Sequence, residues 1–154
     1  MPVLPTSAPS PGTWGTVILG VAASDAHAVA NQLIAASLRL AGFTVVNLGV
    51  CTPLADFARA VDDHPDTLAV AIGSTNGHAF DDLRDLPALR KAGRLGRPVL
   101  VGGNLSVGRH KEESDHTRLL GLGVDRIVAD VTELHEVLLE LAAARGAGSV
   151  TTAL

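Results

Sequence analysis

Aromatic side chains are scarce in this chain: they make up 3% of the 154 residues, and tyrosine is absent. Single-stranded nucleic acids bind proteins largely by stacking their bases on aromatic rings, so the chain has few groups for that contact. The formal net charge is −4, and no dense block of lysine or arginine occurs. A surface that attracts DNA or anionic lipid is therefore missing, and we expect neither nucleic acid nor membrane as a partner.

Long apolar runs and cysteines are equally scarce. No run approaches the roughly 20 apolar residues that a membrane-spanning helix needs. The first residues, MPVLPTSAPSPGTWG, lack a basic region followed by an apolar stretch, so a secretory signal is not expected. The one cysteine, Cys51, cannot form an internal disulfide, which favours a cytoplasmic location and a role as a small apolar loop residue.

Small aliphatic residues are what the chain has in plenty. Hydrophobic residues make up 47% of it, and most are alanine, valine or leucine, which suits helices packed on a parallel sheet. The length suits one domain. We expect residues 1–14, which carry four prolines, to be a flexible tail, residues 15–146 to be the domain, and residues 147–154 to be a frayed terminus.

Five short, nearly continuous apolar runs alternate with stretches of helical character. Such runs are typical of parallel strands that are buried on both faces. The expected strands are Thr16–Ala22, Phe43–Gly49, Leu68–Ile72, a strand that includes Pro98–Val101, and Asp125–Ala129.

A helix is expected after each of these strands. The first covers Ala28–Leu40 and ends at Gly42, and its apolar residues at helical spacing are Val29, Leu33, Ala36 and Leu40. Thr52 and Pro53 are suited to cap and begin the second helix, and Asp85 and Pro87 the third. A fourth covers residues 112–120, and the closing helix carries the stripe Leu134, Val137, Leu138 and Leu141.

Strands that alternate with helices in this way predict an α/β fold with one parallel sheet. Parallel neighbours require crossover connections, and these are right-handed, so a doubly wound, Rossmann-like sheet follows. For five strands we expect the flavodoxin-like order 2-1-3-4-5. Ligands bind such sheets beyond the carboxyl ends of the strands, which directs attention to loops 23–27, 50–53, 73–79, 102–110 and 130–132.

The first of these loops reads Ser24-Asp25-Ala26-His27. A neutral imidazole is a good ligand for a transition metal, and a carboxylate on its other nitrogen fixes the tautomer and raises its basicity. Asp25 is close enough to His27 for that role if the loop turns back. Alternatively, Asp25 or Ser24 only caps the first helix and His27 is an ordinary first-turn residue; the spacing alone favours this interpretation, because D-x-H is a short and common string.

Two further loops at the same edge are small and polar. Gly102-Gly103-Asn104 follows the fourth strand, where glycines allow a ligand to approach the backbone or, alternatively, form a tight turn. The third strand is followed by the run Gly73-Ser74-Thr75-Asn76-Gly77. Three permissive loops at one edge make a binding site more credible than any one of them.

Three segments resemble one family: VILGVAASDAHAVANQLIAASLRLAGFTVVNLGVCTP, then VLVGGNLSVGRH, then GVDRIVA. Together they look like the small cobalamin-binding subunit of glutamate mutase (methylaspartate mutase), and the likeness covers roughly residues 15–145. The signature of that family is D-x-H-x-x-G, then S-x-L, then G-G. Asp25 and His27 match its first motif, and Gly102 and Gly103 match its last.

The resemblance implies a bound cobalamin whose own dimethylbenzimidazole has left cobalt. His27 would take the vacated lower position as the metal ligand, with Asp25 hydrogen-bonded behind it, while the nucleotide tail enters the domain beside the sheet. No catalytic residue is implied. The residues that the resemblance assigns to the cofactor are Ser24, Asp25, Ala26, His27, Ala30, Gly73, Ser74, Thr75, Gly77, Gly102, Gly103, Asn104 and Ala129.

The chain departs from the signature at three positions. Ala30 stands where the family has glycine, which adds one methyl group near the corrin or its tail. Gly73 and Thr75 stand at the serine and leucine of S-x-L, so the hydroxyl that would bond the benzimidazole nitrogen is absent unless Ser74 or Thr75 replaces it. The loss of one such bond costs ~1 kcal/mol net.

As a function, the resemblance implies an isomerase subunit that holds adenosylcobalamin. A larger catalytic subunit would bind the amino acid, and the reaction of the family interconverts L-glutamate and threo-3-methylaspartate. One alternative is a corrinoid carrier for methyl transfer, although residues 1–14 are too short and proline-rich for the helical module such carriers have. Another is a non-enzymatic domain that has lost cobalamin. A phosphoacceptor receiver domain ranks last, because the acidic pair after the first strand is missing.

Overall fold

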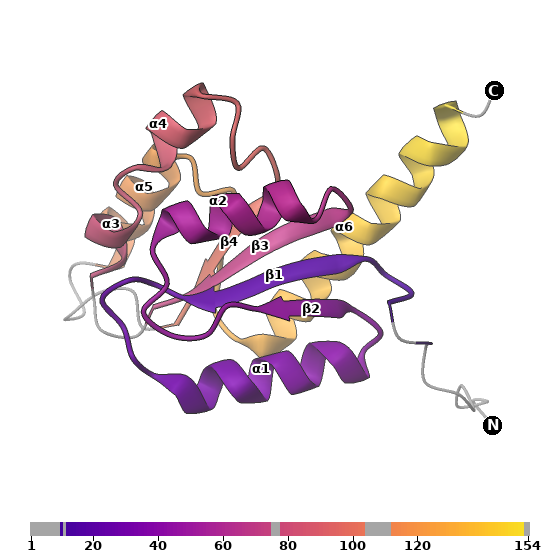
Figure 1. Ribbon diagram of the computed structural model, residues 1–154, viewed down its shortest axis with the longest axis horizontal. Helices are drawn as coiled ribbons and strands as arrows, with labels where there is room; N and C mark the ends of the chain where they lie inside the picture. Colours follow the sequence, from indigo (N-terminus) through magenta and orange to yellow (C-terminus); the bar gives the residue numbers. More distant parts are fainter. Residues whose placement is uncertain (1–9, 11, 75–77, 104–111, 153–154) are drawn as a thin grey trace.

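The computed structural model describes residue 10 and residues 12–74, 78–103 and 112–152; within these, the side chains of 112–114 and 147–152 are left aside. Its single sheet has the order β2-β1-β3-β4-β5, and all neighbouring strands are parallel (Figure 1). The predicted flavodoxin-like order is confirmed. The strands are β1 (Thr16–Val21), β2 (Thr44–Asn47), β3 (Thr67–Gly73), β4 (Val99–Gly102) and β5 (Arg126–Val128).

Six helices are seen in the described part of the chain. They are α1 (Ala28–Leu40), α2 (Leu54–Asp63), α3 (Ala79–Asp82), α4 (Leu86–Lys91), α5 (Glu112–Leu122) and α6 (Val131–Thr152). None of them, within the described residues, is long and apolar enough to cross a membrane.

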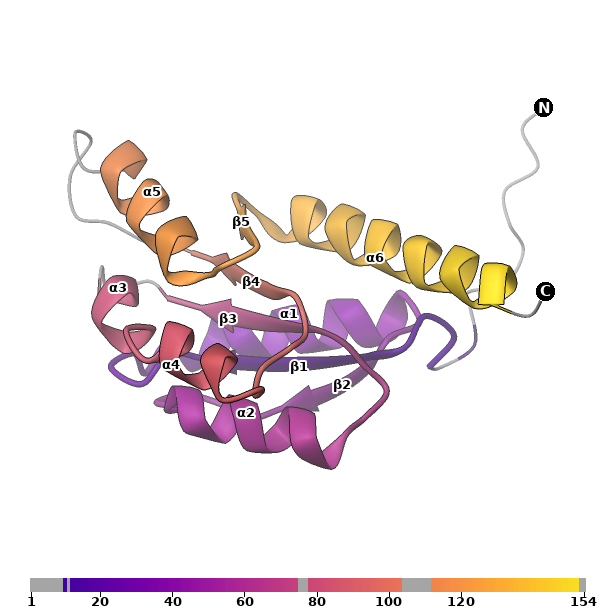
Figure 2. The same ribbon diagram turned by 90° about the horizontal axis from the view of Figure 1, so that it is seen from above.

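The central strands are buried on both faces, as their continuous apolar runs predict. All six residues of β1 are buried, and alternate side chains serve the two faces of the sheet. Val17 belongs to the buried cluster that includes residues of α1 and α6, whereas Ile18 belongs to the one that includes residues of α2, α3, α4 and α5. Figure 2 shows α2 and α1 on opposite sides of the sheet, with α6 leaving the end of β5.

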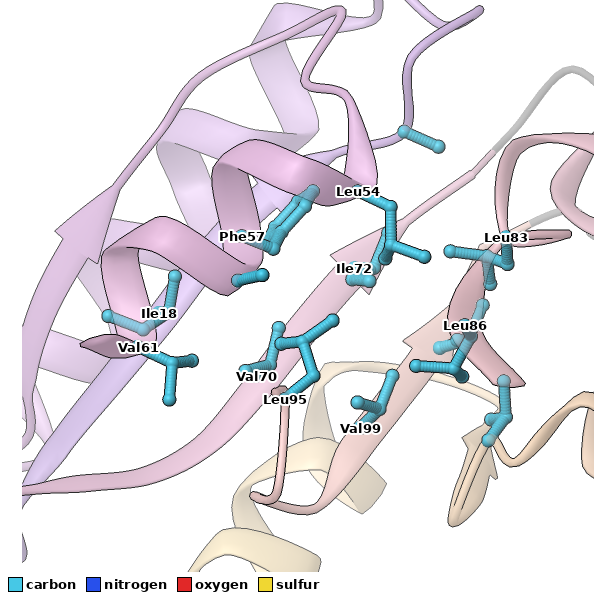
Figure 3. Packing of buried hydrophobic residues seen from close by; sticks show 14 of the residues in the cluster. Ile18, Leu54, Phe57, Val61, Val70, Ile72, Leu83, Leu86, Leu95 and Val99 are labelled. Atoms are coloured by element: carbon cyan, nitrogen blue, oxygen red, sulfur yellow. The ribbon is translucent and has the colours of Figure 1, made fainter. Parts of the chain in front are cut away.

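The face covered by α2 holds the larger cluster of buried residues. Figure 3 shows Leu54, Phe57 and Val61 of α2 directed at the strands. Phe57 is 1% exposed, and it fills the space that Gly20 of β1 leaves: a Cβ atom at Gly20 would lie 2.7 Å from its ring. This face is therefore closely packed from the sheet to the helix.

The apolar residues whose spacing predicted helix α1 are not the residues that the helix buries. Val29, Leu33 and Leu40 are 75%, 66% and 78% exposed, and the buried residues are Asn31, Ala35 and Leu38. An apolar stripe of that spacing normally faces the core. The helix is apolar on both sides, with Arg39 as its one ionisable residue, so its pattern does not distinguish the inner face from the outer one.

Several helix ends differ from the prediction. Thr52 was expected to cap α2, and this is wrong: its hydroxyl donates to the carbonyl of Gly49 at 3.1 Å, and Pro53 occupies the N-cap position. Two helices, rather than one, connect β3 with β4. Asp85 stands at the N-cap of α4 but makes no side-chain capping bond.

Both ends of the described chain are more ordered than the sequence predicts. The helical backbone of α6 continues past Gly146 to Thr152. Within the segment expected as a tail, the indole of Trp14 donates to the carbonyl of Ala41 at 2.9 Å. Trp14 thereby ties the start of the chain to the end of α1.

Candidate functional site

The loop between β1 and α1 is held in place by its neighbours at the carboxyl edge of the sheet. Ala22 donates its N–H to the carbonyl of Gly73, and Asp25 donates its own to Ala22. The carbonyl of Asp25 accepts the N–H of Cys51, which lies in the left-handed region with φ 51°. Backbone bonds from two adjacent loops thus fix Asp25, which is 1% exposed.

Asp25 and His27 form a close pair. One carboxylate oxygen, Oδ1, lies 2.5 Å from the ring Nδ1 of His27 and also accepts the backbone N–H of His27 at 2.9 Å. The Asp25 side chain is fully buried, whereas that of His27 is 67% exposed. With the Nδ1 proton held by the carboxylate, Nε2 keeps its lone pair for a metal.

The structure shows the Asp25–His27 pair but no capping of α1 by Asp25, because the N-cap residue is His27 and no side-chain capping bond is made there. Asp25 accepts the N–H of His27, the N-cap residue of α1, and it also binds the ring. Ser24 does neither: its hydroxyl donates to Asp82 of α3 at 2.6 Å. Asp25 therefore sets the backbone turn and the orientation of the imidazole with one oxygen.

A cavity of about 200 Å³ begins at His27 and extends between the sheet, α1 and the start of α6. The strands contribute mostly apolar side chains and glycine backbone to its wall, and α1 contributes one face. Its lining residues are Leu19, Gly20, Val21, His27, Ala30, Asn31, Ile34, Ala71, Ile72, Gly73, Leu100, Gly102, Gly103, Val128, Ala129, Asp130, Val131 and Leu134.

The glycines of the cavity wall are required by the fold itself. A Cβ atom on Gly102 would lie 2.9 Å from Cγ2 of Val128. Gly103 has φ +105°, and a Cβ atom there would overlap the carbonyl oxygen of Ser74. Gly73 is different, because a Cβ atom there would meet nothing closer than 3.9 Å. The G-G pair thus allows two loops to close on each other beside the cavity.

The predicted cofactor residues fall into three groups. Those that line the cavity are His27, Ala30, Gly73, Gly102, Gly103 and Ala129, and Asp25 lies behind His27. Ser24, Ala26 and Ser74 are not part of the cavity wall. Thr75, Gly77 and Asn104 lie outside the described residues.

Ser74 does not offer the missing hydroxyl to the cavity. Ser74 follows the last residue of β3 and is not part of the cavity wall. It is 1% exposed, and within the described part of the chain its hydroxyl has no hydrogen-bond partner. The expectation that Ser74 replaces the serine of S-x-L is therefore not supported.

Sequence reasoning missed the contributions of two helices to the cavity. Asn31 and Ile34 of α1 and Leu134 of α6 were not predicted, whereas Asp130, just before α6, and Val131, its first residue, lie in the loop 130–132 that the sequence singled out. Asn31 had a readable signal, because it is polar and stands one helical turn after His27 on the same face. Leu134 carries no chemical signal and becomes apparent only once α6 packs beside α1.

The described residues include no group of three or more histidine, cysteine or acidic side chains that could enclose a metal ion. A metal at His27 would have this one protein ligand from the described residues, with the rest of its coordination supplied by a cofactor. Together with the apolar cavity, this pattern fits a metal that arrives inside an organic macrocycle.

The family profile of the B12 binding domain matches residues 15–129, so the chain belongs to this class of cobalamin-binding domains. Solved structures agree in fold. A cobalamin-binding protein from Desulfitobacterium hafniense aligns with a TM-score of 0.66 and 19% identity over 82% of this chain. The monomethylamine corrinoid protein of Methanosarcina barkeri aligns with a TM-score of 0.65 and 20% identity over 83%. This chain spans 58% of the length of each.

Within that class the chain belongs to the glutamate mutase sigma subunits. It is 42% identical to the sigma subunit of Halobacterium salinarum over 123 residues, which cover 80% of this chain and 82% of that one. It is 37% identical to the sigma subunit of Clostridium tetani over 119 residues, 76% and 85% of the two chains. The resemblance seen in the sequence is confirmed, and the relatives favour it over a methyl carrier.

Proposed function

We propose that this chain is the adenosylcobalamin-binding subunit of a glutamate mutase and that His27 is the lower axial ligand of cobalt. The observation that carries the proposal is the buried Asp25 carboxylate on Nδ1 of His27, at the entrance of the apolar cavity. The proposed setting is the cytoplasm, where Cys51 remains a thiol.

The cavity suits the tail of a cobalamin. A dry apolar cavity of about 150 Å³ is enough to hold benzene, and this one measures about 200 Å³. Its wall consists mainly of aliphatic side chains and glycine backbone, which favours an aromatic base over a charged or strongly hydrated group. At the carboxyl end of β3, Gly73 has room for a methyl group, since a Cβ atom there would meet its nearest neighbour at 3.9 Å.

When bound, adenosylcobalamin supplies the radical chemistry of a carbon-skeleton rearrangement. Asp25 would hold the proton on Nδ1 of His27, so that Nε2 would be available to bind cobalt. The aliphatic wall excludes water from the tail. The described cavity is accounted for by that tail, so we assign the amino acid to a larger catalytic subunit that covers the His27 edge.

Absorption spectroscopy of the purified chain with hydroxocobalamin tests the proposal. Wild type should give the spectrum of a cofactor whose base has left cobalt and been replaced by histidine. His27→Ala should lose the histidine-ligated spectrum. His64→Ala is the matched control: His64 is the C-cap residue of α2 and does not line the cavity, so this variant should behave as wild type. A His27→Ala spectrum identical to that of wild type would rule out the assignment.

A further inference from the structure

A second polar side chain, Asn31, lines the cavity. It stands on the buried face of α1, four residues after His27, and is only 4% exposed. Its neighbours on that face are Ala35 and Leu38, both fully buried and apolar. An amide in such surroundings requires an explanation, because apolar residues would fill the position at no desolvation cost.

The Asn31 amide has no hydrogen-bond partner among the residues that the structure describes. The other two polar side chains of the cavity wall are engaged: His27 with Asp25, and Asp130 with the N–H of Glu133 at 2.8 Å. Asn31 is not among the residues whose unpartnered polar atoms are wholly enclosed, so its amide is accessible from the cavity. Asn31 is thus an unused donor and acceptor that faces a space large enough for a ligand.

The opposite wall explains why a second polar group is needed. Gly73 carries no hydroxyl, and Ser74 is not part of the cavity wall. A nucleotide tail brings hydrogen-bonding atoms of its own, including the base nitrogen that has left cobalt. In a wall that is otherwise aliphatic and glycine backbone, these atoms require a partner.

We propose that the Asn31 amide hydrogen-bonds the nucleotide tail of the bound corrinoid and makes the chain select corrinoids that carry such a tail. This inference rests on the proposed function. Asn31 acts on the tail alone, because the contact of His27 with cobalt is independent of it. The consequence is a difference between two ligands: cobalamin, which has the tail, and cobinamide, which lacks it.

The test is a titration of the full chain with hydroxocobalamin and with aquacobinamide, followed by absorbance. Wild type should bind cobalamin more tightly than cobinamide. Asn31→Leu, of similar size but without polar atoms, should weaken cobalamin binding about tenfold, as for one hydrogen bond of ~1.4 kcal/mol, and leave cobinamide binding unchanged. Gln32→Met replaces the neighbouring exposed amide and should change neither affinity.

A merely structural role for Asn31 would give a different result. Because the amide has no partner in the described chain, the cofactor-free Asn31→Leu protein should unfold at the same temperature as wild type or higher. A lower unfolding temperature, an equal loss of affinity for both corrinoids, or no loss at all overturns the inference. If Asn31→Leu does not fold, Asn31→Ala gives the same comparison. If wild type binds neither corrinoid, the proposed function itself is wrong.

Discussion

Asp25→Asn is the substitution that most directly separates the orientation of His27 from its presence. The side chain of Asp25 is fully buried, and its Oδ1 accepts both the ring Nδ1 at 2.5 Å and the backbone N–H of His27 at 2.9 Å. Asparagine has the same shape, so the turn remains possible. The substitution removes the negative charge. It also allows the side chain to present its N–H₂ group, which cannot accept a hydrogen bond, to the His27 ring.

The expected loss of cobalamin affinity in Asp25→Asn follows from these two hydrogen bonds. Hydrogen bonds to a charged group contribute about 1.5–3 kcal/mol, against about 0.5–1.5 kcal/mol for neutral ones. The difference of ~1–1.5 kcal/mol corresponds to roughly a tenfold loss of affinity. Loss of a carboxylate behind a metal-bound histidine typically costs 10–100-fold, which is consistent with this estimate. We therefore expect Asp25→Asn to bind cobalamin about 10- to 100-fold more weakly than wild type.

The assay is a hydroxocobalamin titration at constant pH and salt. Asp81→Asn is the matched control, because Asp81 is an exposed carboxylate of α3 that pairs with Arg84 and does not line the cavity. Wild-type affinity in Asp25→Asn would refute the reasoning, since the buried charge would then contribute nothing to the ligand. A large loss in Asp81→Asn would show that any removed charge weakens binding.

Three further predictions concern the fold around the site. Gly103→Ala should destabilise the protein by about 1–3 kcal/mol through backbone strain at φ +105° alone, and urea unfolding with wild-type stability would contradict this. Leu38→Ala should cost about 2–5 kcal/mol, whereas Leu33→Ala, at a 66% exposed position, should change stability by less than about 0.5 kcal/mol; equal losses would place the wrong face of α1 inside. The Thr16 hydroxyl donates to Asp66 at 2.6 Å and lowers the pKa of that carboxyl, so Thr16→Val should raise the pKa toward its ordinary value. A carboxyl whose pKa is lowered on folding stabilises the protein above the unfolded pKa of about 4, and this contribution is lost in more acid solution. The difference in stability between Thr16→Val and wild type should therefore narrow as the pH falls. An NMR titration of the Asp66 carboxyl measures its pKa, and an unchanged pKa in Thr16→Val would contradict the reasoning.

The sheet was predictable because the strands buried on both faces are apolar along most of their length. A strand buried on both faces must be apolar throughout, as β1 and β3 are, and right-handed crossovers leave few strand orders. Helix α1 was predictable in its bounds but not in its orientation. Both its faces carry apolar residues, and its buried face begins with the polar Asn31, so the pattern did not show which face lies inside.

The candidate site was predictable where one loop contains it, and not where several elements meet. Asp25 and His27 are two residues apart, so local geometry joins them. The involvement of Asn31 depends on which face of α1 is buried, and that of Leu134 on α6 packing beside α1. The sequence left open whether Gly103 allows ligand approach or a tight turn, and the structure shows a close contact with Ser74 that requires glycine there.

The most direct test of the account is the electron paramagnetic resonance spectrum of the cobalt(II) form bound to protein in which histidine is labelled with ¹⁵N. If His27 is the lower ligand, each cobalt line is split into a triplet by unlabelled protein and into a doublet by labelled protein. His27→Ala should lose the change. A triplet that persists in labelled wild-type protein would mean that the nitrogen on cobalt belongs to the cofactor, and the central claim would be wrong.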